Sequence, residues 1–130
     1  MSLIIDTSVV ISVITEEKHK PRLVNLTWGQ ELISPVSLHW EIGNAITAMF
    51  KRKRITISQA KKAIEAYNSI PLKLIEPDLV SSIQIAEKLN IYAYDAYFLD
   101  CAKNLNLPIL SLDQGLLNAA KEINIKIIEI

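Results

Sequence analysis

The chain has few of the residues that build covalent or nucleotide-binding frameworks. Its 130 residues include one cysteine, Cys101, and three glycines. A single cysteine excludes an internal disulfide framework and a cysteine-rich zinc site, and it is typical of a reducing compartment. The scattered glycines form neither a G-x-G-x-x-G pattern nor a P-loop, which disfavours a nucleotide-binding module.

The chain also lacks an excess of charge of either sign and a long apolar run. Fourteen basic and fourteen acidic residues give a formal net charge of +0, which argues against binding nucleic acid by bulk electrostatics. The apolar N-terminal stretch is interrupted by Asp6 and has no positive segment before it, so we expect neither a signal peptide nor a membrane span. A chain of this length that is 50% hydrophobic can build one core. We therefore expect one cytoplasmic domain over residues 1–130.

Short apolar runs alternate with amphipathic stretches along the chain. The runs predict strands at Leu3–Ile5, Glu31–Ser34, Leu72–Ile75, Pro108–Ser111 and Lys126–Ile128. The stretches predict helices at Thr7–Glu16, Pro21–Trp28, Ser37–Arg52, Ser58–Ser69 (with Ser58 as N-cap), Asp78–Leu89, Tyr94–Leu105 and Asp113–Ile123. This alternation predicts an α/β protein, a three-layer α/β/α fold with a central, mostly parallel sheet of four to five strands.

Two of the five aspartates directly follow predicted core strands. Asp6 comes after Leu3–Ile5, and Asp113 comes after the run Ile109–Leu112. In open α/β sheets, ligands bind beyond the carboxyl ends of the strands, where both aspartates would lie. Capping of the following helix is an equally good interpretation of each aspartate taken alone.

Two further acids lie on apolar helix faces. Glu41 shares a face with Leu38 and Ala45, and Asp95 lines up with Leu99. A carboxylate in such a place is costly unless it is paired, and basic partners are scarce nearby. A divalent cation would neutralise several converging carboxylates, and oxygen ligands favour magnesium or manganese over zinc. The alternative is that these faces are solvated, because helix phase is uncertain from sequence.

Four short motifs together resemble a PIN domain. They are Leu3-Ile4-Ile5-Asp6-Thr7-Ser8, Trp40-Glu41-Ile42-Gly43-Asn44-Ala45, Tyr94-Asp95-Ala96 and Leu110-Ser111-Leu112-Asp113. Each motif is weak alone, but the four acids stand in the order and contexts of that family. The length and motif order are similar to those of the VapC toxin ribonucleases of VapBC toxin–antitoxin systems.

The resemblance implies a role for each matching residue. Four acids match the family's catalytic, metal-binding acids: Asp6, Glu41, Asp95 and Asp113. Three polar residues match supporting positions: Ser8, which would help hold a metal-bound water, Asn44 of the E-x-x-N-A pattern, and Ser111. Leu112 departs from the polar residue that many relatives carry. Asp100 has no counterpart; we expect it to be solvated, with an acid just outside the metal ligands as the alternative.

The resemblance also implies an activity and partners. The activity is Mg²⁺-dependent endoribonuclease cleavage, with one or two ions and Mn²⁺ as a substitute. The partners are the RNA substrate, a small antitoxin whose tail blocks the acidic pocket, and a second copy of the chain in a homodimer.

Lys51-Arg52-Lys53-Arg54 is the one dense basic run. It ends the predicted helix that carries Glu41, so it would contact the RNA backbone, cap the helix C-terminus, or do both. Lys61 and Lys62 would extend this basic strip.

Other noticeable side chains have ordinary structural interpretations. We expect His19 and His39 to be surface or core histidines, and Cys101 to be a small buried side chain. Trp28 and Trp40 are expected in the core or at an interface. Core packing is expected for Tyr92, Tyr94 and Tyr97, which cluster around Asp95, with base stacking as the alternative.

Rival functions lack residues that they require. A dehalogenase-like phosphatase needs a second acid two residues after Asp6, where Ser8 stands. A receiver domain needs a lysine after the strand that ends at Ser111, and none follows. An RNA-processing PIN nuclease outside any toxin–antitoxin pair stays open. A PIN-like scaffold that only binds protein stays open too, although its usual mark is the loss of acids.

Overall fold

The computed structural model describes residues 1–130 as a parallel sheet with seven helices. The strands are β1 (Ser2–Ile5), β2 (Glu31–Pro35), β3 (Leu72–Ile75) and β4 (Ile109–Leu110). The helices are α1 (Thr7–Ile14), α2 (Lys20–Thr27), α3 (Ser37–Lys51), α4 (Ile57–Asn68), α5 (Leu79–Leu89), α6 (Ala93–Leu105) and α7 (Gln114–Glu122). None of these helices is both long enough and apolar enough to span a membrane.

The sheet has the order β3-β2-β1-β4, and all of its strand pairs are parallel. Ile4 of β1 lies opposite Ile33 of β2 on one side and Ile109 of β4 on the other. β1 is therefore an interior strand, which explains its continuous run of apolar residues. Because every strand points the same way, every connection that leaves a strand starts from the same edge of the sheet. We call this edge the carboxyl edge.

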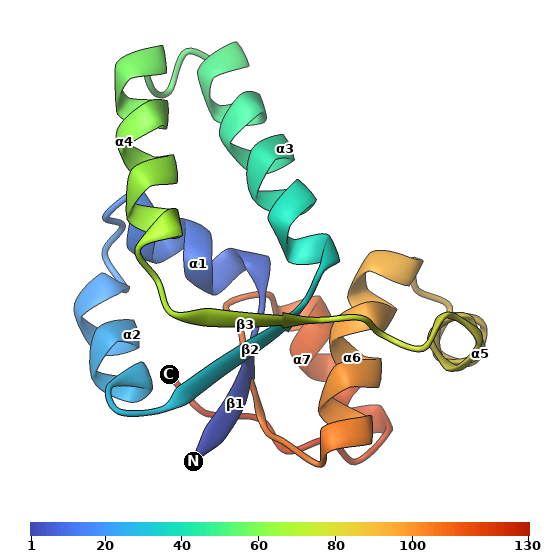
Figure 1. Ribbon diagram of the computed structural model, residues 1–130. Helices are drawn as coiled ribbons and strands as arrows, with labels where there is room; N and C mark the ends of the chain where they lie inside the picture. The colour runs from blue at the N-terminus through green and yellow to red at the C-terminus, as the bar shows by residue number, and fades with distance from the viewer.

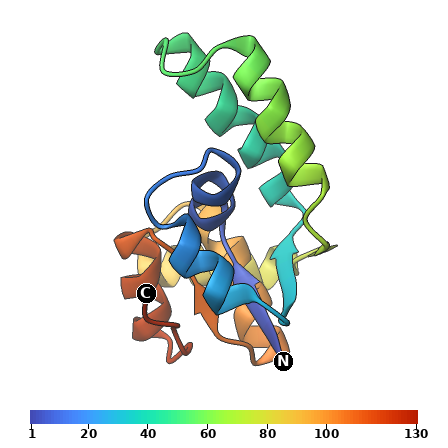
Figure 2. The same cartoon turned by 90° about the vertical axis from the view of Figure 1, so that its left-hand side faces the viewer.

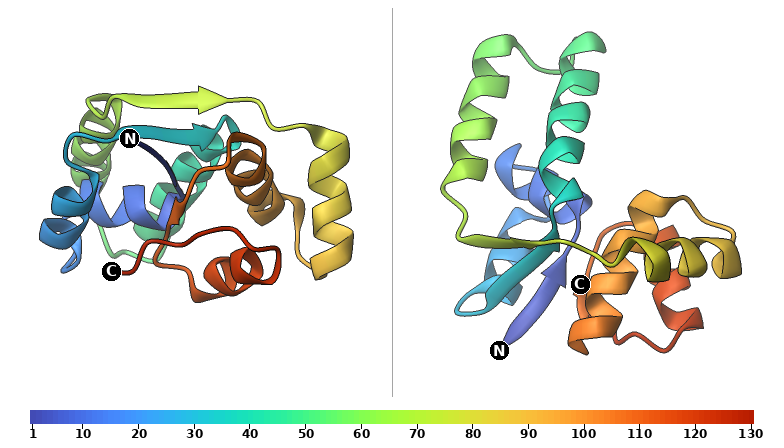
Figure 3. Two further views of the ribbon diagram at one scale, coloured as in Figure 1. Left: turned by 90° about the horizontal axis from the view of Figure 1, so that it is seen from below. Right: turned by 45° about the vertical axis from the view of Figure 1, so that its right-hand side comes forward.

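Helices cover both faces of the sheet, which confirms the predicted three-layer arrangement. α1 and α2 lie on one face, and α6 and α7 lie on the other, with α5 outside α6 (Figures 1 and 3). α3 and α4 form an antiparallel hairpin that extends well beyond the rest of the molecule (Figure 2). The base of this hairpin packs on α1.

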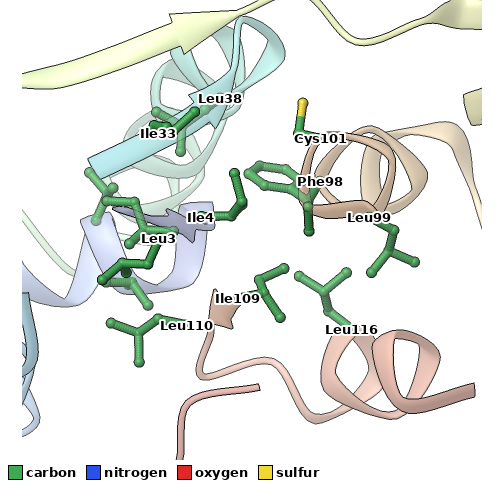
Figure 4. Close-up of a cluster of buried hydrophobic side chains, with 14 of the residues drawn as sticks. Leu3, Ile4, Ile33, Leu38, Phe98, Leu99, Cys101, Ile109, Leu110 and Leu116 are labelled. Atoms are coloured by element: carbon green, nitrogen blue, oxygen red, sulfur yellow. The ribbon is translucent and has the colours of Figure 1, made fainter. Parts of the chain in front are cut away.

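The core joins the sheet to helices on both faces. Ile4, Ile33 and Ile109 meet side chains of α6 such as Phe98 and Leu99 (Figure 4). Phe98 is 2% exposed, and Leu99 is fully buried. Burial of side chains this large contributes about 1.5–3 kcal/mol each. α6, which carries Asp95 near its start, is thus firmly anchored on the sheet.

The residues at helix ends follow local chemistry. Asp6, Asp78 and Asp113 each accept a backbone N–H of the helix that they precede. Asn90 and Asn106 end α5 and α6 in the left-handed conformation, which asparagine tolerates better than most residues. The capping interpretation of Asp6 and Asp113 is therefore confirmed.

The predicted cap of the fourth helix is wrong. α4 begins two residues earlier than a Ser58 cap would allow, and its N-cap is Thr56. The Thr56 hydroxyl accepts the Gln59 N–H at 3.1 Å, and the Gln59 amide oxygen accepts the Thr56 N–H at 2.8 Å. This reciprocal capping box satisfies two backbone donors, whereas a Ser58 cap would have no Glu or Gln three residues later.

The predicted last strand, Lys126–Ile128, is reduced to one parallel bridge between Ile127 and Ile109. The Ile109 N–H donates to Lys126 O, and the Ile128 N–H donates to Ile109 O, each at 2.9 Å. β4 is two residues long, so its neighbour has room for one pairing only.

The expectation that Asp100 is solvated is also wrong. Asp100 is 1% exposed on α6 and faces the start of α5. Its carboxylate accepts the Asp78 N–H at 2.9 Å, the Ser81 hydroxyl, and the Asn104 amide at 3.2 Å. Three donors, two of them from the first turn of a helix, offset the loss of water around the charge. Asp100 therefore joins α5 to α6.

The two candidate caps of α4 give a direct test of the helix start. Replacing Thr56 by alanine removes the side-chain acceptor of the capping box, so we expect a loss of about 1 kcal/mol in the free energy of unfolding. Ser58→Ala is the matched control and should change it by less than about 0.5 kcal/mol. Urea denaturation of both variants measures the difference, and a larger loss from Ser58→Ala would contradict this helix start.

Candidate functional site

Four acids from four separate segments meet at the carboxyl edge. Asp6 follows β1, Glu41 lies on α3, Asp95 lies in the first turn of α6, and Asp113 precedes α7. The negative charge of Asp113 raises the pKa of Asp6 and of Asp95, and the charges of Asp95 and Asp6 raise the pKa of Glu41. The four carboxylates therefore form one electrostatic cluster, which we call the acidic cluster.

Asp6 is the most deeply buried member of the acidic cluster, with 5% of its surface exposed. Its Oδ1 accepts the Ser8 hydroxyl at 2.7 Å and the Val9 N–H at 3.2 Å, and its Oδ2 accepts the Ser111 hydroxyl at 2.7 Å. Burial raises the pKa of Asp6, and the two hydroxyls and the N–H lower it in part. Its partners are all neutral, so they orient the carboxylate but leave its charge uncancelled.

Ser8 and Ser111 link Asp6 to the segment that carries Asp113. The Leu112 N–H donates to Ser8 Oγ and the Asp113 N–H donates to Ser111 Oγ, each at 2.9 Å. Each hydroxyl thus accepts one backbone proton while it donates its own to Asp6. Such chains of hydrogen bonds polarise one another. The backbone at Asp113 is therefore fixed relative to Asp6.

Glu41 is half-buried and points one oxygen at the start of α1. Its Oε1 accepts the Thr7 hydroxyl at 3.1 Å, while its Oε2 is buried with no hydrogen-bond partner. Burial is the largest cause of its raised pKa. The Ser37 hydroxyl, one turn earlier on α3, lies close enough to lower the pKa of Glu41 in part, so Oε2 has a donor beside it and is also open to a cation.

Asp95 and Asp113 are more accessible than Asp6. Asp95 is half-buried, and burial together with the charge of Asp113 raises its pKa. Asp113 is exposed, and its Oδ1 accepts the Gly115 N–H at 2.9 Å and the Leu116 N–H at 3.3 Å. Capping therefore occupies one oxygen of Asp113 and leaves Oδ2 open to a ligand.

No basic side chain neutralises the acidic cluster. The one ion pair of the chain joins Lys20 to the exposed Glu16, away from these four acids. The shortage of basic partners predicted from the sequence is therefore present in the structure.

A protein-family model described as PIN domain matches residues 3–122. The chain belongs to the PIN domain family. The four acids of the cluster all lie inside the matched range.

Solved structures show the same fold at low sequence identity. PAE2754 of Pyrobaculum aerophilum has a TM-score of 0.74 and 19% identity, over 98% of this chain and 83% of that one. VapBC2 of Rickettsia felis, bound to a DNA fragment from its promoter, has a TM-score of 0.68 and 12% identity, over 98% of both chains. FitAcB of Neisseria gonorrhoeae has a TM-score of 0.64 and 19% identity, over 99% and 97%. A comparison with curated proteins found no match.

The residues of this PIN domain suit a hard divalent cation. Its donors are all carboxylate oxygens, the ligands that magnesium and manganese prefer, and Glu41 Oε2 is buried and unpartnered. As the side chains stand, no three of them are arranged to hold one ion together. Asp6 and Asp113 each turn an oxygen toward nearby N–H or O–H donors. A bound cation would therefore require side-chain rotations.

The remaining predicted site residues lie farther from the acidic cluster. Asn44 is exposed on α3, one turn after Glu41. The basic run Lys51–Arg54 lies at the tip of the α3–α4 hairpin (Figure 2), and all four of its residues are exposed. Ten residues of helix at about 1.5 Å each separate Glu41 from Lys51 by about 15 Å. The run is therefore near the acidic cluster but not part of it.

Several aromatic residues are exposed rather than packed in the core. Trp28 is 81% exposed, Trp40 71%, Tyr92 88% and Tyr94 59%. The expectation of core packing is therefore wrong for Tyr92 and Tyr94. Trp28 and Trp40 lie outside the core, and an interface role for them stays a prediction. His39 is exposed and forms a 3.1 Å hydrogen bond between Nδ1 and the Tyr67 hydroxyl. This hydrogen bond does not place His39 in the acidic cluster.

Cys101 has the environment that the sequence predicts. It is buried, and burial together with the nearby charge of Asp100 raises the pKa of its thiol to about 12. It is therefore not a nucleophile at neutral pH.

Sequence reasoning missed Thr7 as a member of the site. Its hydroxyl is the hydrogen-bond donor to Glu41, 34 residues away. The available signal was its position directly after Asp6, where a side chain of the first helical turn points to the carboxyl edge.

The raised pKa values predict how pH acts on the metal-free protein. A carboxyl whose pKa is raised on folding binds its proton more tightly in the folded state. Its full contribution to the free energy of unfolding is therefore present below the pKa that it has in the unfolded chain. That contribution is lost as pH rises through the folded pKa. For Glu41, whose ordinary value is 4.5, stability should therefore fall as pH rises above about 4.5.

The variant Glu41→Gln isolates this effect. Glutamine keeps the shape but does not ionise, so the decline in stability above pH 4.5 should become shallower. Urea denaturation in EDTA at several pH values measures this dependence of stability on pH. Glu122→Gln, which changes an exposed glutamate, is the control. An unchanged slope in Glu41→Gln would show that Glu41 is not destabilised by its surroundings.

Proposed function

We propose that this PIN domain, residues 1–130, is a Mg²⁺- or Mn²⁺-dependent endoribonuclease and the toxin of a toxin–antitoxin pair. The observation that carries the proposal is the acidic cluster: four carboxylates from four segments with no basic partner. Asp6, Asp95 and Asp113 would hold one or two ions directly. Glu41 would bind through water or accept a proton.

Hydrolysis of an RNA phosphodiester needs an activated water and relief of negative charge in the transition state. Four bare carboxylates would repel the phosphate. Bound Mg²⁺ or Mn²⁺ supplies Lewis-acid activation of water and neutralises the developing charge. The protein must then orient the acids and manage protons, and both tasks can be assigned to residues of this chain.

The hydroxyl groups around Asp6 orient the acids. Ser8 and Ser111 hold both oxygens of Asp6 within 2.7 Å, and Thr7 holds one oxygen of Glu41. Glu41 makes no hydrogen bond through Oε2, so this oxygen is placed to accept a proton. Glu41 is therefore our candidate for the proton acceptor, and Ser8 and Ser111 for positioning residues. Asn44, which is exposed on α3 one turn after Glu41, would contact the substrate.

The basic run Lys51–Arg54 would bind the RNA backbone. It is exposed and lies about 15 Å along α3 from Glu41. Phosphates a few nucleotides from the cleaved bond would lie within its reach. Such contacts add affinity and position the strand without reading its sequence.

The toxin assignment rests on family membership and on the folds of VapBC2 and FitAcB. It implies a cytoplasmic protein that forms a homodimer and binds an antitoxin with a basic tail over the acidic cluster. Co-expression with the product of the adjacent gene tests the partner. Recovery of the chain alone, as an active monomer, would contradict both partner assignments.

Asp95→Asn tests the nuclease mechanism. Asparagine lacks the negative charge of aspartate and so weakens cation binding. Mn²⁺-dependent cleavage of single-stranded RNA should therefore fall by about 100-fold or more. EDTA should abolish cleavage by the unmodified chain. Glu122→Gln, which changes an exposed acid at the end of α7, is the matched control. Cleavage that persists in EDTA would rule out the mechanism.

The paired change Arg52→Gln and Arg54→Gln tests the role of the basic run. Removing two phosphate contacts should weaken RNA binding for all sequences alike and should lower the slope of log affinity against log salt concentration by about 1.4. Lys121→Gln with Lys126→Gln, an equal loss of charge from exposed residues elsewhere, should leave the slope unchanged. Equal slopes for the two paired variants would leave helix capping as the role of the run.

A further inference from the structure

A hollow of about 280 Å³ lies beside the acidic cluster at the carboxyl edge. Its lining includes Ser37 and Trp40 of α3, Glu76 and Leu79 around the start of α5, and Tyr97 of α6. Ser37 comes two residues after β2, and Glu76 directly follows β3. The hollow therefore opens at the same edge as the acidic cluster, beyond the other pair of strands.

The two helices that carry Glu41 and Asp95 also form walls of the hollow. Ser37 lies one turn before Glu41 on the same face of α3, and Trp40 directly precedes Glu41. Tyr97 lies on α6, two residues after Asp95. The start of α3, the connection from β3 to α5 and the start of α6 lie close together in Figures 1 and 3. Ser37 thus lines the hollow and also lies beside the Glu41 carboxylate, which makes the hollow and the acidic cluster neighbours on α3.

The chemistry of the lining excludes a phosphate and suits a flat ring with N–H donors. No lysine or arginine lines the hollow, and Glu76 is exposed without an ion pair. Trp40, which is 71% exposed, and Tyr97 supply aromatic surface for stacking. The Glu76 carboxylate accepts hydrogen bonds only. The volume lies just below the range for drug-sized ligands, so one small heterocycle fits.

We propose that this hollow binds a guanine base of the RNA whose backbone crosses the acidic cluster. The proposal rests on the nuclease function and names its base specificity. The ring stacks on Trp40, and the Glu76 carboxylate accepts both N1–H and N2–H of the guanine edge. Adenine, cytosine and uracil do not present two adjacent N–H groups at separate ring positions to one carboxylate. Tyr97 closes the inner side of the hollow.

The competing occupant is a second copy of the chain. Leu79, Val80 and Ile83 on the outer face of α5 are each more than half exposed, and such apolar patches often mark protein interfaces. Leu79 lines the hollow, but Val80 and Ile83 lie outside it, whereas Glu76 and Trp40 both line it. Carboxylate and aromatic surface together favour the base, and dimerisation is an outcome that the test must separate.

Nucleotide binding tests the hollow without any cleavage. In Trp28→Phe, Trp40 is the one indole, and GMP should quench its fluorescence at lower concentration than UMP. In Trp40→Phe, the matched control, the remaining Trp28 should respond equally to both nucleotides, because it precedes β2 at the opposite edge of the sheet. Adding Glu76→Gln to Trp28→Phe should raise the GMP dissociation constant by about ten-fold and leave UMP unchanged.

Cleavage mapping tests the same hollow in the working enzyme. With Mn²⁺ and an RNA of mixed sequence, cleavage should concentrate at one fixed position relative to guanines. Trp40→Ala should lower kcat/KM about ten-fold or more, Glu76→Gln should spread cleavage over other bases, and Trp28→Ala should do neither.

Each outcome decides a separate point. Equal quenching of Trp40 by GMP and UMP, or none, overturns the guanine site. Loss of a dimer in sedimentation of Trp40→Ala, without any nucleotide effect, assigns the hollow to a second copy instead. Selective GMP binding by a chain that cleaves no RNA supports the hollow and refutes the proposed nuclease.

Discussion

The buried carboxylate of Asp6 is the interaction on which the carboxyl edge depends. It accepts donors from the first turn of α1 and from Ser111 after β4, 105 residues away. Those donors are neutral dipoles, so they fix the place of the charge without removing it. The charge of Asp6 therefore stays available to the cation that we propose, and its burial without a basic partner is costly to the metal-free fold.

Capping and ligand binding are compatible roles for the same acids. A helix N-terminus needs one acceptor oxygen, and a carboxylate has two. Asp113 gives Oδ1 to α7, and Glu41 gives Oε1 to Thr7, which leaves the second oxygen of each without a hydrogen bond. The occupied oxygen sets the direction of the free one. Capping of α7 by Oδ1 therefore leaves Oδ2 of Asp113 available for the cation that we propose.

Much of the fold was predictable because it follows from local patterns. Apolar runs gave the strands, and acids directly after β1 and before α7 gave the edge where the cluster lies. Contacts between distant segments were not predictable: Asp100 is buried because α5 supplies its donors. The helical periodicity of the sequence shows which face of α3 or α6 carries Trp40 or Tyr94. It does not show whether another helix or strand covers that face. Thr56 and Ser58 are similar caps locally, and only the reciprocal bond to Gln59 separates them.

The core sets the direction in which the acid-bearing faces of α3 and α6 point. Leu38, Ile42 and Ile46 hold one face of α3 against the protein, and Phe98 and Leu99 do the same for α6. A shift of one residue would turn either face by about 100° and carry Glu41 or Asp95 away from the edge. The cluster exists only while this packing holds, so a bound cation favours the folded state alone. Cation affinity and fold stability are then linked, and each raises the other.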